Sequence, residues 1–257
     1  MIYKIKNTLL NVSNEIKELD DYIFGRLSQF ETIEKENTKN FLKFKQNSVE
    51  IQIEENLKIF NNKIIKTDIY PIINNIVAYL INDKDNILIH AIVVSKNDKG
   101  ILIVGDFGQG KSTLATEYKI NGYEINSTDQ TWLQAKKGKI YQKLGSRFDI
   151  KNNEIVMLKK EKTIKNIEIK KIIRPVGICD EGKVTLNENK NKYHIIKNLA
   201  SSCNWTYSMP LFTDNIELFN INIYIKDFLN KIIEAKIPVI DVRGDKKKIL
   251  QELGDIK

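Results

Sequence analysis

The chain has 257 residues, of which 42% are hydrophobic and 29% charged, and its formal net charge is +8. These values are typical of a globular protein with a core of ordinary size, and they exclude a disordered chain. No apolar run approaches the roughly 20 residues that a transmembrane helix needs, and the N-terminal segment lacks the hydrophobic region of a secretory signal. We therefore expect a cytoplasmic protein without membrane contact.

The positive charge comes mainly from lysines spread along the chain. It indicates either a solvated Lys/Asn/Ile-rich surface or attraction to phosphate-rich or acidic partners. No Arg-rich tract or aromatic RNP-like motif supports a nucleic-acid partner. Two cysteines, Cys179 and Cys203, and two histidines, His90 and His194, offer neither a disulfide framework nor the usual zinc spacing. We interpret the cysteines as thiols in a reducing compartment.

Residues 1–85 are predicted to form a small α+β accessory region. Apolar residues at helical spacing after Ser13, a candidate N-cap, predict a first helix over 13–27. A second helix is expected over 68–80, with Pro71 in its first turn, where the missing N–H costs little. Alternating apolar and polar residues predict short strands between these helices, at 41–45, 49–53 and 62–66.

Residues 86–257 are predicted to form an α/β core on a mixed sheet. Two apolar runs, 86–94 and 100–105, flank a turn at 97–100, and a helix over 111–121 ends at Gly122. A strand at 123–126 and a hairpin over 131–144 follow. The remaining predicted elements are strands at 154–158, 167–173, 183–186 and 237–242, and helices at 192–202, 225–236 and 245–253.

A glycine-rich segment between the second apolar run and its helix carries the clearest functional signal. Gly105, Gly110, Lys111 and Ser112 match the Walker A pattern G-x-x-x-x-G-K-[ST]. Glycines let backbone amides point inward at phosphate oxygens, and the helix N-terminus adds partial positive charge. The lysine suits the β- and γ-phosphates and the serine hydroxyl suits Mg²⁺. The residues predicted to hold nucleotide are Gly105, Phe107, Gly108, Gln109, Gly110, Lys111, Ser112 and Thr113.

An acidic metal ligand is harder to identify. Asp241 ends an apolar strand like a Walker B aspartate, but it lies far downstream of Lys111. Asp129 comes soon after the loop, just beyond the next predicted strand. A carboxylate there can face Mg²⁺ if that strand lies beside the loop.

The segment "IHAIVV…GILIVGDFGQGKSTLATEYKINGYEINSTDQTWL" within residues 86–133 resembles the catalytic core of the HPr kinase/phosphorylase family, which shares its core with phosphoenolpyruvate carboxykinases. His90-Ala91 stands at the family's spacing before Lys111, and Asp106 falls within the family's GDxGxGKS loop. The resemblance implies a P-loop kinase using ATP and Mg²⁺ to phosphorylate a hydroxyl, such as a serine of a peptide or small protein. It also allows a homo-oligomer. The catalytic residues it implies are Lys111, His90, Asp106 and Asp129.

The sequence departs from the family at one important position. Family members place two adjacent aspartates after the loop helix, the first a general base and the second a metal ligand; here these positions are Thr128 and Asp129. A threonine hydroxyl does not accept a proton near neutral pH as a carboxylate does. The family's Glu-Arg-Gly-rich and Asn-Pro-Gly-Arg segments are also absent, so the resemblance is to small, peptide-modifying or stand-alone relatives rather than to the HPr enzyme. A non-catalytic nucleotide-binding module and a small-molecule hydroxyl kinase remain alternatives.

Several single residues have two interpretations. His90 is either a hydrogen-bonded core histidine or a substitute base near the transferred phosphate. Asp106 either forms the turn or supplies a second carboxylate, and Asp129 either forms an Asx-turn or contacts the metal. Two arginines either clamp phosphate or lie on the surface, and two tryptophans belong to the core or to a pocket wall; these residues are Arg147, Arg174, Trp132 and Trp205.

Overall fold

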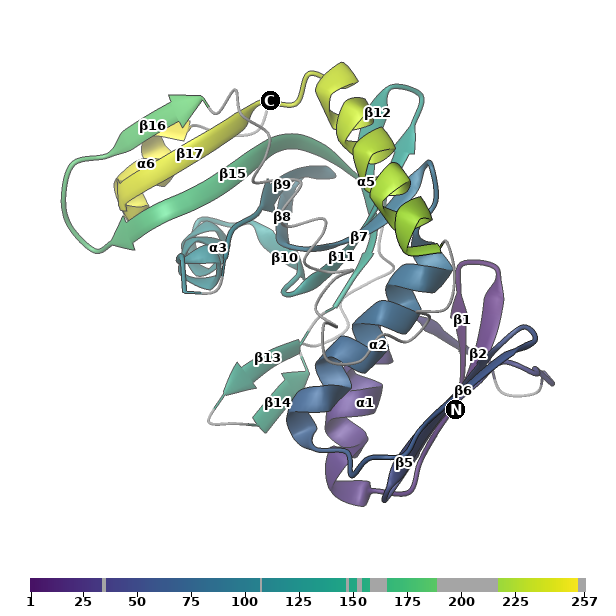
Figure 1. Cartoon of the computed structure of the whole chain (residues 1–257). Coiled ribbons are helices and arrows are strands. Elements are labelled where there is room, and N and C mark those ends of the chain that lie inside the picture. The colour runs from purple at the N-terminus through teal and green to yellow at the C-terminus, as the bar shows by residue number, and fades with distance from the viewer. Residues whose placement is uncertain are drawn as a thin grey trace.

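The computed structural model describes residues 1–33, 36–106, 108–146, 148–151, 154–157, 166–188 and 217–253. Within these segments the chain has a mixed α/β architecture with two large sheets (Figure 1). The mixed α/β class expected from the sequence is therefore confirmed. The division into an accessory region and a core at residue 85 stays a prediction.

The first sheet comes from the N-terminal part of the chain. Its six described strands run in the order β3-β1-β2-β4-β5-β6. β2 and β4 pair in parallel, and every other pair is antiparallel. The strands are β1 (Ile2–Ile5), β2 (Thr8–Asn14), β3 (Glu31–Ile33), β4 (Phe41–Lys45), β5 (Ser48–Ile53) and β6 (Asn56–Phe60).

Two helices connect this sheet to the rest of the molecule. A short 3-10 turn, η1 (Lys17–Leu19), leads into α1 (Asp20–Leu27), which packs on α2 (Lys66–Ile81). α2 contacts β1 of the first sheet and β7 (Asn86–His90) of the second (Figure 1). Apolar residues of both sheets and of both helices belong to one continuous hydrophobic cluster. A helix with core on more than one side is apolar over most of its surface, which explains the isoleucine-rich sequence of α2.

The structure corrects three N-terminal predictions. The first helix begins at Asp20, because Ser13 lies in strand β2. No strand forms at 62–66, since β6 ends at Phe60. Pro71 lies inside α2 rather than in its first turn, because that helix already begins at Lys66. In the turns after β1 and β5 the residues with positive φ are Lys6 and Glu54, both at 56°. Neither is a glycine or an asparagine, the residue types by which such turns are recognised in a sequence.

The second sheet occupies the rest of the described chain. A path of strands runs in the order β10-β8-β9-β15-β12-β11-β7, and β15 also pairs with β17, which pairs with β16. The β15 pairings with β9 and β17 are parallel. These strands are β7, β8 (Ile92–Lys96), β9 (Lys99–Ile103), β10 (Glu124–Ser127), β11 (Gln130–Lys136), β12 (Lys139–Gly145), β15 (Ile167–Cys179), β16 (Thr185–Glu188) and β17 (Val239–Asp245). A separate hairpin joins β13 (Phe148–Lys151) to β14 (Glu154–Met157).

Helices cover both faces of this sheet. α3 (Lys111–Ile120) packs against β8 and against α6 (Lys246–Leu253), whereas α5 (Glu217–Glu234) packs against β7 and β12 (Figure 1). Alternate residues of β8 and β9 therefore enter two different hydrophobic clusters. Strands buried on both faces show continuous apolar runs, as the sequence of these two strands does.

The later predictions hold with shifted ends. The strand expected at 183–186 is β16, the helix expected at 225–236 begins at Glu217, and the closing strand and helix are β17 and α6. The helix predicted at 192–202 lies outside the described residues.

Candidate functional site

The glycine-rich loop connects the C-terminal end of β9 to the start of α3. Gly105, Gly108 and Gly110 have φ of 152°, 77° and 93°, values that favour glycine. The amide of Asp106 donates to the side-chain oxygen of Gln109 at 2.9 Å, which closes the turn. Phe107 lies outside the described residues. The loop thus has three glycines in the left-handed region of φ, a conformation that turns backbone amides to one side of a loop.

Neighbouring β15 restricts the end of this loop. A Cβ added to Gly110 would lie 2.8 Å from Cγ1 of Ile178, a residue of β15. A Cβ added to Gly108 would meet nothing within 4 Å. Gly110 is therefore required both for its backbone conformation and for the close approach of β15.

Lys111 is the first residue of α3, and its side chain turns back over the loop. Its Nζ donates to the carbonyl oxygens of Gly105, at 2.7 Å, and Asp106, at 3.0 Å. Lys111 is 9% exposed, and burial lowers its pKa, while the charges of Asp129 and Asp106 oppose that shift. The ammonium is thus held above the loop and interacts electrostatically with Asp129. Ser112 and Thr113, in the same helical turn, are exposed, as is Asp106.

His90 and Asp129 lie together where β7 ends and β11 begins. His90 pairs with Gln130 in the sheet, and the amide of Ala91 donates to the carbonyl oxygen of Asp129 at 2.9 Å. Nδ1 of His90 lies 2.8 Å from Oδ1 of Asp129. Both side chains are largely buried, with exposed fractions of 10% and 16%. The two residues singled out in the sequence therefore form a hydrogen-bonded pair.

Two residues that the sequence did not indicate complete this cluster. Nη1 of Arg26, from α1, lies 3.2 Å from Oδ2 of Asp129, and the Arg26 guanidinium stacks 4.1 Å from the centre of the Tyr70 ring. The hydroxyl of Tyr70, from α2, lies 3.4 Å from Oδ1 of Asp129 and 3.3 Å from Nδ1 of His90. Arg26 is one of four arginines in the chain, and it stands among the apolar residues of an amphipathic helix. A charged residue on the buried face of a helix is the signal that could have identified it.

These partners determine the charge of Asp129. Burial by itself would raise its pKa, but the hydrogen bond of His90, the charge that His90 carries when protonated and the charge of Arg26 outweigh burial and lower it. Burial also lowers the pKa of Arg26, while Asp129 opposes that shift, and burial raises the pKa of Tyr70. We therefore treat Asp129 as an ionised carboxylate with a neighbouring cation from the N-terminal part of the chain.

Thr128 does not point to base chemistry. Its hydroxyl donates to the carbonyl oxygen of Ser146 at 3.0 Å, and its amide donates to the same oxygen at 2.8 Å. Thr128 thus joins the connection between β10 and β11 to the residue that follows β12.

Arg174 and Asp241 lie at the same end of the sheet as the loop, because Arg174 follows Ile173, whose carbonyl oxygen accepts from the amide of Val104 at 2.9 Å. Arg174 makes a two-point ion pair with Asp241, with Nε to Oδ1 at 2.8 Å and Nη2 to Oδ2 at 2.5 Å. Trp132 is buried, and its Nε1 donates to Oδ1 of Asn86 at 3.0 Å. The predicted residues Arg147, His194, Cys203 and Trp205 lie outside the described residues, whereas Cys179 is an exposed free thiol.

The donor atoms near the loop are suited to Mg²⁺ rather than to a softer metal. Magnesium prefers oxygen ligands and keeps several waters and substrate phosphates in its coordination sphere. The carboxylate of Asp129 and the hydroxyl of Ser112 are such ligands, and no group of three or more His, Cys, Asp or Glu side chains that could form a metal cage occurs in the described part of the chain. Because Arg26 and His90 already contact both oxygens of Asp129, a metal there would have to replace or share one of these contacts.

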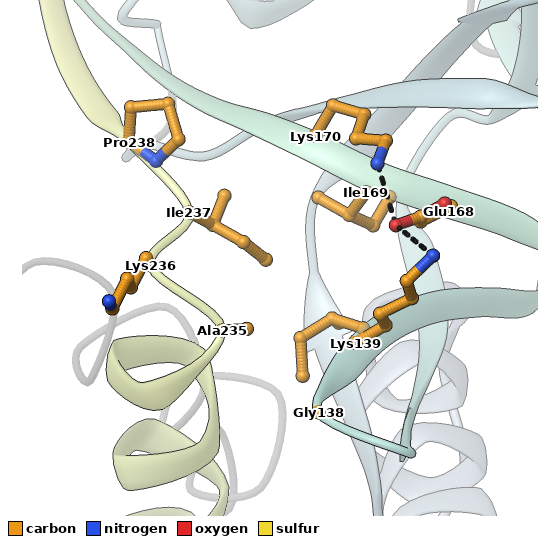
Figure 2. A pocket seen from close by; sticks show the side chains of 10 residues that line it. Gly138, Lys139, Glu168, Ile169, Lys170, Ala235, Lys236, Ile237 and Pro238 are labelled. Carbon is orange, nitrogen blue, oxygen red and sulfur yellow. Dashed lines mark hydrogen bonds and ion pairs between the residues drawn. The ribbon is translucent and has the colours of Figure 1, made fainter.

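A separate cavity of about 200 Å³ lies away from this cluster (Figure 2). It opens between the β11–β12 turn, the first residues of β15 and the α5–β17 connection, and Glu168 pairs there with Lys139 and Lys170. β15 runs parallel to β9, so the start of β15 and the loop after β9 are at opposite ends of the sheet. The cavity is therefore not part of the candidate nucleotide site.

No helix in the described segments is long and apolar enough to cross a membrane.

Comparison with known proteins gives a limited result. No family model matches the sequence, and no curated protein matches it. Among solved structures, the HPr(Ser) kinase/phosphatase from Coxiella burnetii is similar over 36% of this chain, with a TM-score of 0.30 and 18% sequence identity. The match covers 65% of that enzyme, slightly less than two thirds of its length. The chemistry proposed below rests on this chain's own residues.

Proposed function

We propose that this protein is an ATP- and Mg²⁺-dependent kinase that transfers the γ-phosphoryl group to a hydroxyl, such as a serine of a peptide or small protein. The observation that carries the proposal is the loop itself, in which three glycines with positive φ lead into α3. The Lys111 ammonium donates to the loop carbonyl of Gly105, and the negative charge of Asp129 stabilises this ammonium. This combination supports the proposal, because phosphate binding needs backbone amides and a cation that converge on one point. The HPr-kinase-like identity of the core and the P-loop role of residues 105–113 are part of this proposal.

Each residue of the site has a specific task. The loop amides and Lys111 would hold the β- and γ-phosphates, with Lys111 exchanging its two carbonyl contacts for phosphate oxygens. Ser112 and Asp129 would hold Mg²⁺, which when bound neutralises phosphate charge. In phosphoryl transfer, positioning and charge neutralisation provide most of the catalysis, so one missing carboxylate at Thr128 does not forbid the reaction.

His90 is our candidate for the proton acceptor. If its Nδ1–H donates to Asp129, a neutral imidazole carries a lone pair on Nε2. Because Nε2 is buried, the acceptor hydroxyl would have to displace the groups that cover it. The acceptor oxygen would then form a bond to the γ-phosphorus, its proton would pass to Nε2, and the bond from the γ-phosphorus to the ADP oxygen would break. Asp129 would stabilise the resulting imidazolium.

The experiment compares Lys111→Ala with Lys119→Ala, a change at the exposed last turn of the same helix. Wild type and both variants are incubated with ATP, Mg²⁺ and hydroxyl acceptors that include serine peptides and free hydroxy amino acids, and mass spectrometry detects the added phosphoryl group. We expect Lys119→Ala to match the wild type and Lys111→Ala to lose about a hundredfold or more in rate, the effect typical of removing a charge-stabilising donor. Equal labelling by both variants would contradict the proposal. Which acceptor is labelled separates a peptide kinase from a small-molecule kinase.

A second candidate function is nucleotide binding without catalysis. The observation that favours it is the Thr128 hydroxyl, which contacts the Ser146 carbonyl where the family has a carboxylate base. This function predicts thermal stabilisation by ATP and Mg²⁺ without a phosphorylated product. Thr128→Asp discriminates the two: a gain in transfer from an undetectable to a measurable rate would identify the native protein as the non-catalytic form.

A further inference from the structure

The N-terminal helices reach the candidate metal ligand directly. Arg26 and Tyr70 are 103 and 59 residues from Asp129 in the sequence, yet both contact its carboxylate. A second contact joins the same regions, because Nε2 of Gln29, just after α1, donates to Oε1 of Gln130 at 3.2 Å. The end of α1 is thus attached to the first two residues that follow Thr128.

The two oxygens of the Asp129 carboxylate have different partners. Oδ1 faces His90 and the Tyr70 hydroxyl, whereas Oδ2 faces Arg26. Arg26 is only 6% exposed, and its guanidinium is held against the Tyr70 ring. This cation therefore occupies a defined position beside Oδ2 and is not a mobile surface arginine.

We propose that Arg26 is a positioning residue that holds Oδ2 of Asp129 in the nucleotide-free protein and is displaced from it when a magnesium–nucleotide complex binds. The inference rests on the proposed function, because it needs Asp129 as a metal ligand. Its physical basis is charge. A guanidinium 3.2 Å from the carboxylate oxygen would repel a divalent cation that binds the same oxygen, so the two cations exchange rather than share it.

The exchange links α1 to the occupancy of the loop. While Arg26 contacts Oδ2 of Asp129, the carboxylate is held with Oδ1 toward His90. When metal replaces that contact, α1 loses its ion pair with the sheet and only the Gln29–Gln130 hydrogen bond, among the contacts described above, still joins its end to β11. The N-terminal part of the chain would thereby respond to nucleotide.

The first test measures how much Mg²⁺ is needed for ATP to raise the melting temperature. Arg26→Gln removes the competing charge, and we expect its Mg²⁺ midpoint to fall by roughly tenfold. Arg26→Lys keeps the charge and should stay near the wild type. Lys6→Met, which breaks the ion pair between Lys6 in the β1–β2 turn and Asp83 after α2, should leave the midpoint unchanged.

The outcomes separate the two proposals. If ATP with Mg²⁺ does not stabilise the wild type at any concentration, the proposed function fails and this inference fails with it. If the wild type is stabilised but Arg26→Gln shows the wild-type midpoint, only the inference fails.

A second test needs no variant, in case Arg26→Gln does not fold. Amide hydrogen exchange of Asp20–Leu27, the helix α1, is followed in the wild type with ATP and EDTA and then with ATP and Mg²⁺. We expect faster exchange in the presence of Mg²⁺, because the ion pair that holds the helix is lost. Equal or slower exchange would overturn the inference.

Discussion

Nδ1 of His90 and Oδ1 of Asp129 lie 2.8 Å apart, and a backbone hydrogen bond from Ala91 to Asp129 fixes the two chain segments beside them. The pair joins the last residue of β7 to the residue before β11. Since both a backbone and a side-chain hydrogen bond join the two segments, the sheet fixes the relative position of His90 and Asp129. A substitution at this pair therefore tests chemistry and packing together.

Asp129→Asn should destabilise the protein strongly. It leaves Arg26 buried without its carboxylate, and breaking a buried ion pair in this way typically costs about 3–5 kcal/mol. Adding Arg26→Gln should recover part of that loss, because the uncompensated charge is then gone. Urea unfolding of the two single variants and the double variant measures the coupling. Strictly additive effects of the two substitutions on the free energy of unfolding would contradict the ion-pair geometry. The control is Glu168→Gln, at a more exposed carboxylate that pairs with two lysines; it should change stability by about 1 kcal/mol or less.

Gly110→Ala should impair both stability and nucleotide binding. The alanine would have to adopt a φ of 93°, and its methyl group would lie 2.8 Å from Cγ1 of Ile178. Gly108→Ala is the matched control in the same loop, with a φ of 77° and open space around its Cβ. It should cost only about 1–2 kcal/mol of backbone strain. Thermal melting and ATP titration check both variants, and the more severe effect is expected at residue 110. Loss of the same size in the two would contradict the role of β15.

Thr128→Val tests whether the threonine is structural. The change removes the hydroxyl that donates to the Ser146 carbonyl at 3.0 Å but keeps the amide that donates to the same oxygen. We expect a stability loss of about 1 kcal/mol and an unchanged rate of phosphoryl transfer. A rate that drops while stability holds would instead give the hydroxyl a direct part in the reaction.

The lowered pKa of Asp83 predicts how the stability of the protein changes in acid. Burial would raise its pKa, but hydrogen bonds from Lys6, from Asn86 and from the amide of Asp85 outweigh burial and lower it. A carboxyl whose pKa is lower in the folded protein contributes stability that is complete above its unfolded value, about 3.9, and is lost as the pH falls through the folded value. Asp83→Asn should therefore lower the melting temperature near neutral pH and show a smaller further loss below pH ~4 than the wild type. Melting curves from pH 7 to pH 3 measure the difference; parallel curves for the two proteins would contradict the assignment.

The local features of the site could be predicted from the sequence because short-range geometry encodes them. Glycines at 105, 108 and 110, followed by a lysine and a helical pattern, specify the loop whatever surrounds it, and the observed φ values agree. The strands before the loop were recognisable because burial on two faces leaves an apolar run, but the run at 86–94 forms two strands, β7 and β8, which have different neighbours in the sheet. The N-terminal strands were missed where a lysine and a glutamate adopt the turn conformation that glycine usually marks.

The partners of Asp129 could not be predicted, because they depend on packing between distant segments. Arg26 approaches it only because α1 packs on α2, and Tyr70 only because α2 lies against β7. Neither contact can be recognised from a residue spacing in the sequence, since contacts across two helices and a sheet have no fixed separation along the chain. The sequence by itself determined a glycine loop, its helix and the residues at the ends of two strands. Only the tertiary structure decided that an arginine from the first helix is the cation beside the candidate metal ligand, because burial of one shared hydrophobic cluster brings α1, α2 and the second sheet together.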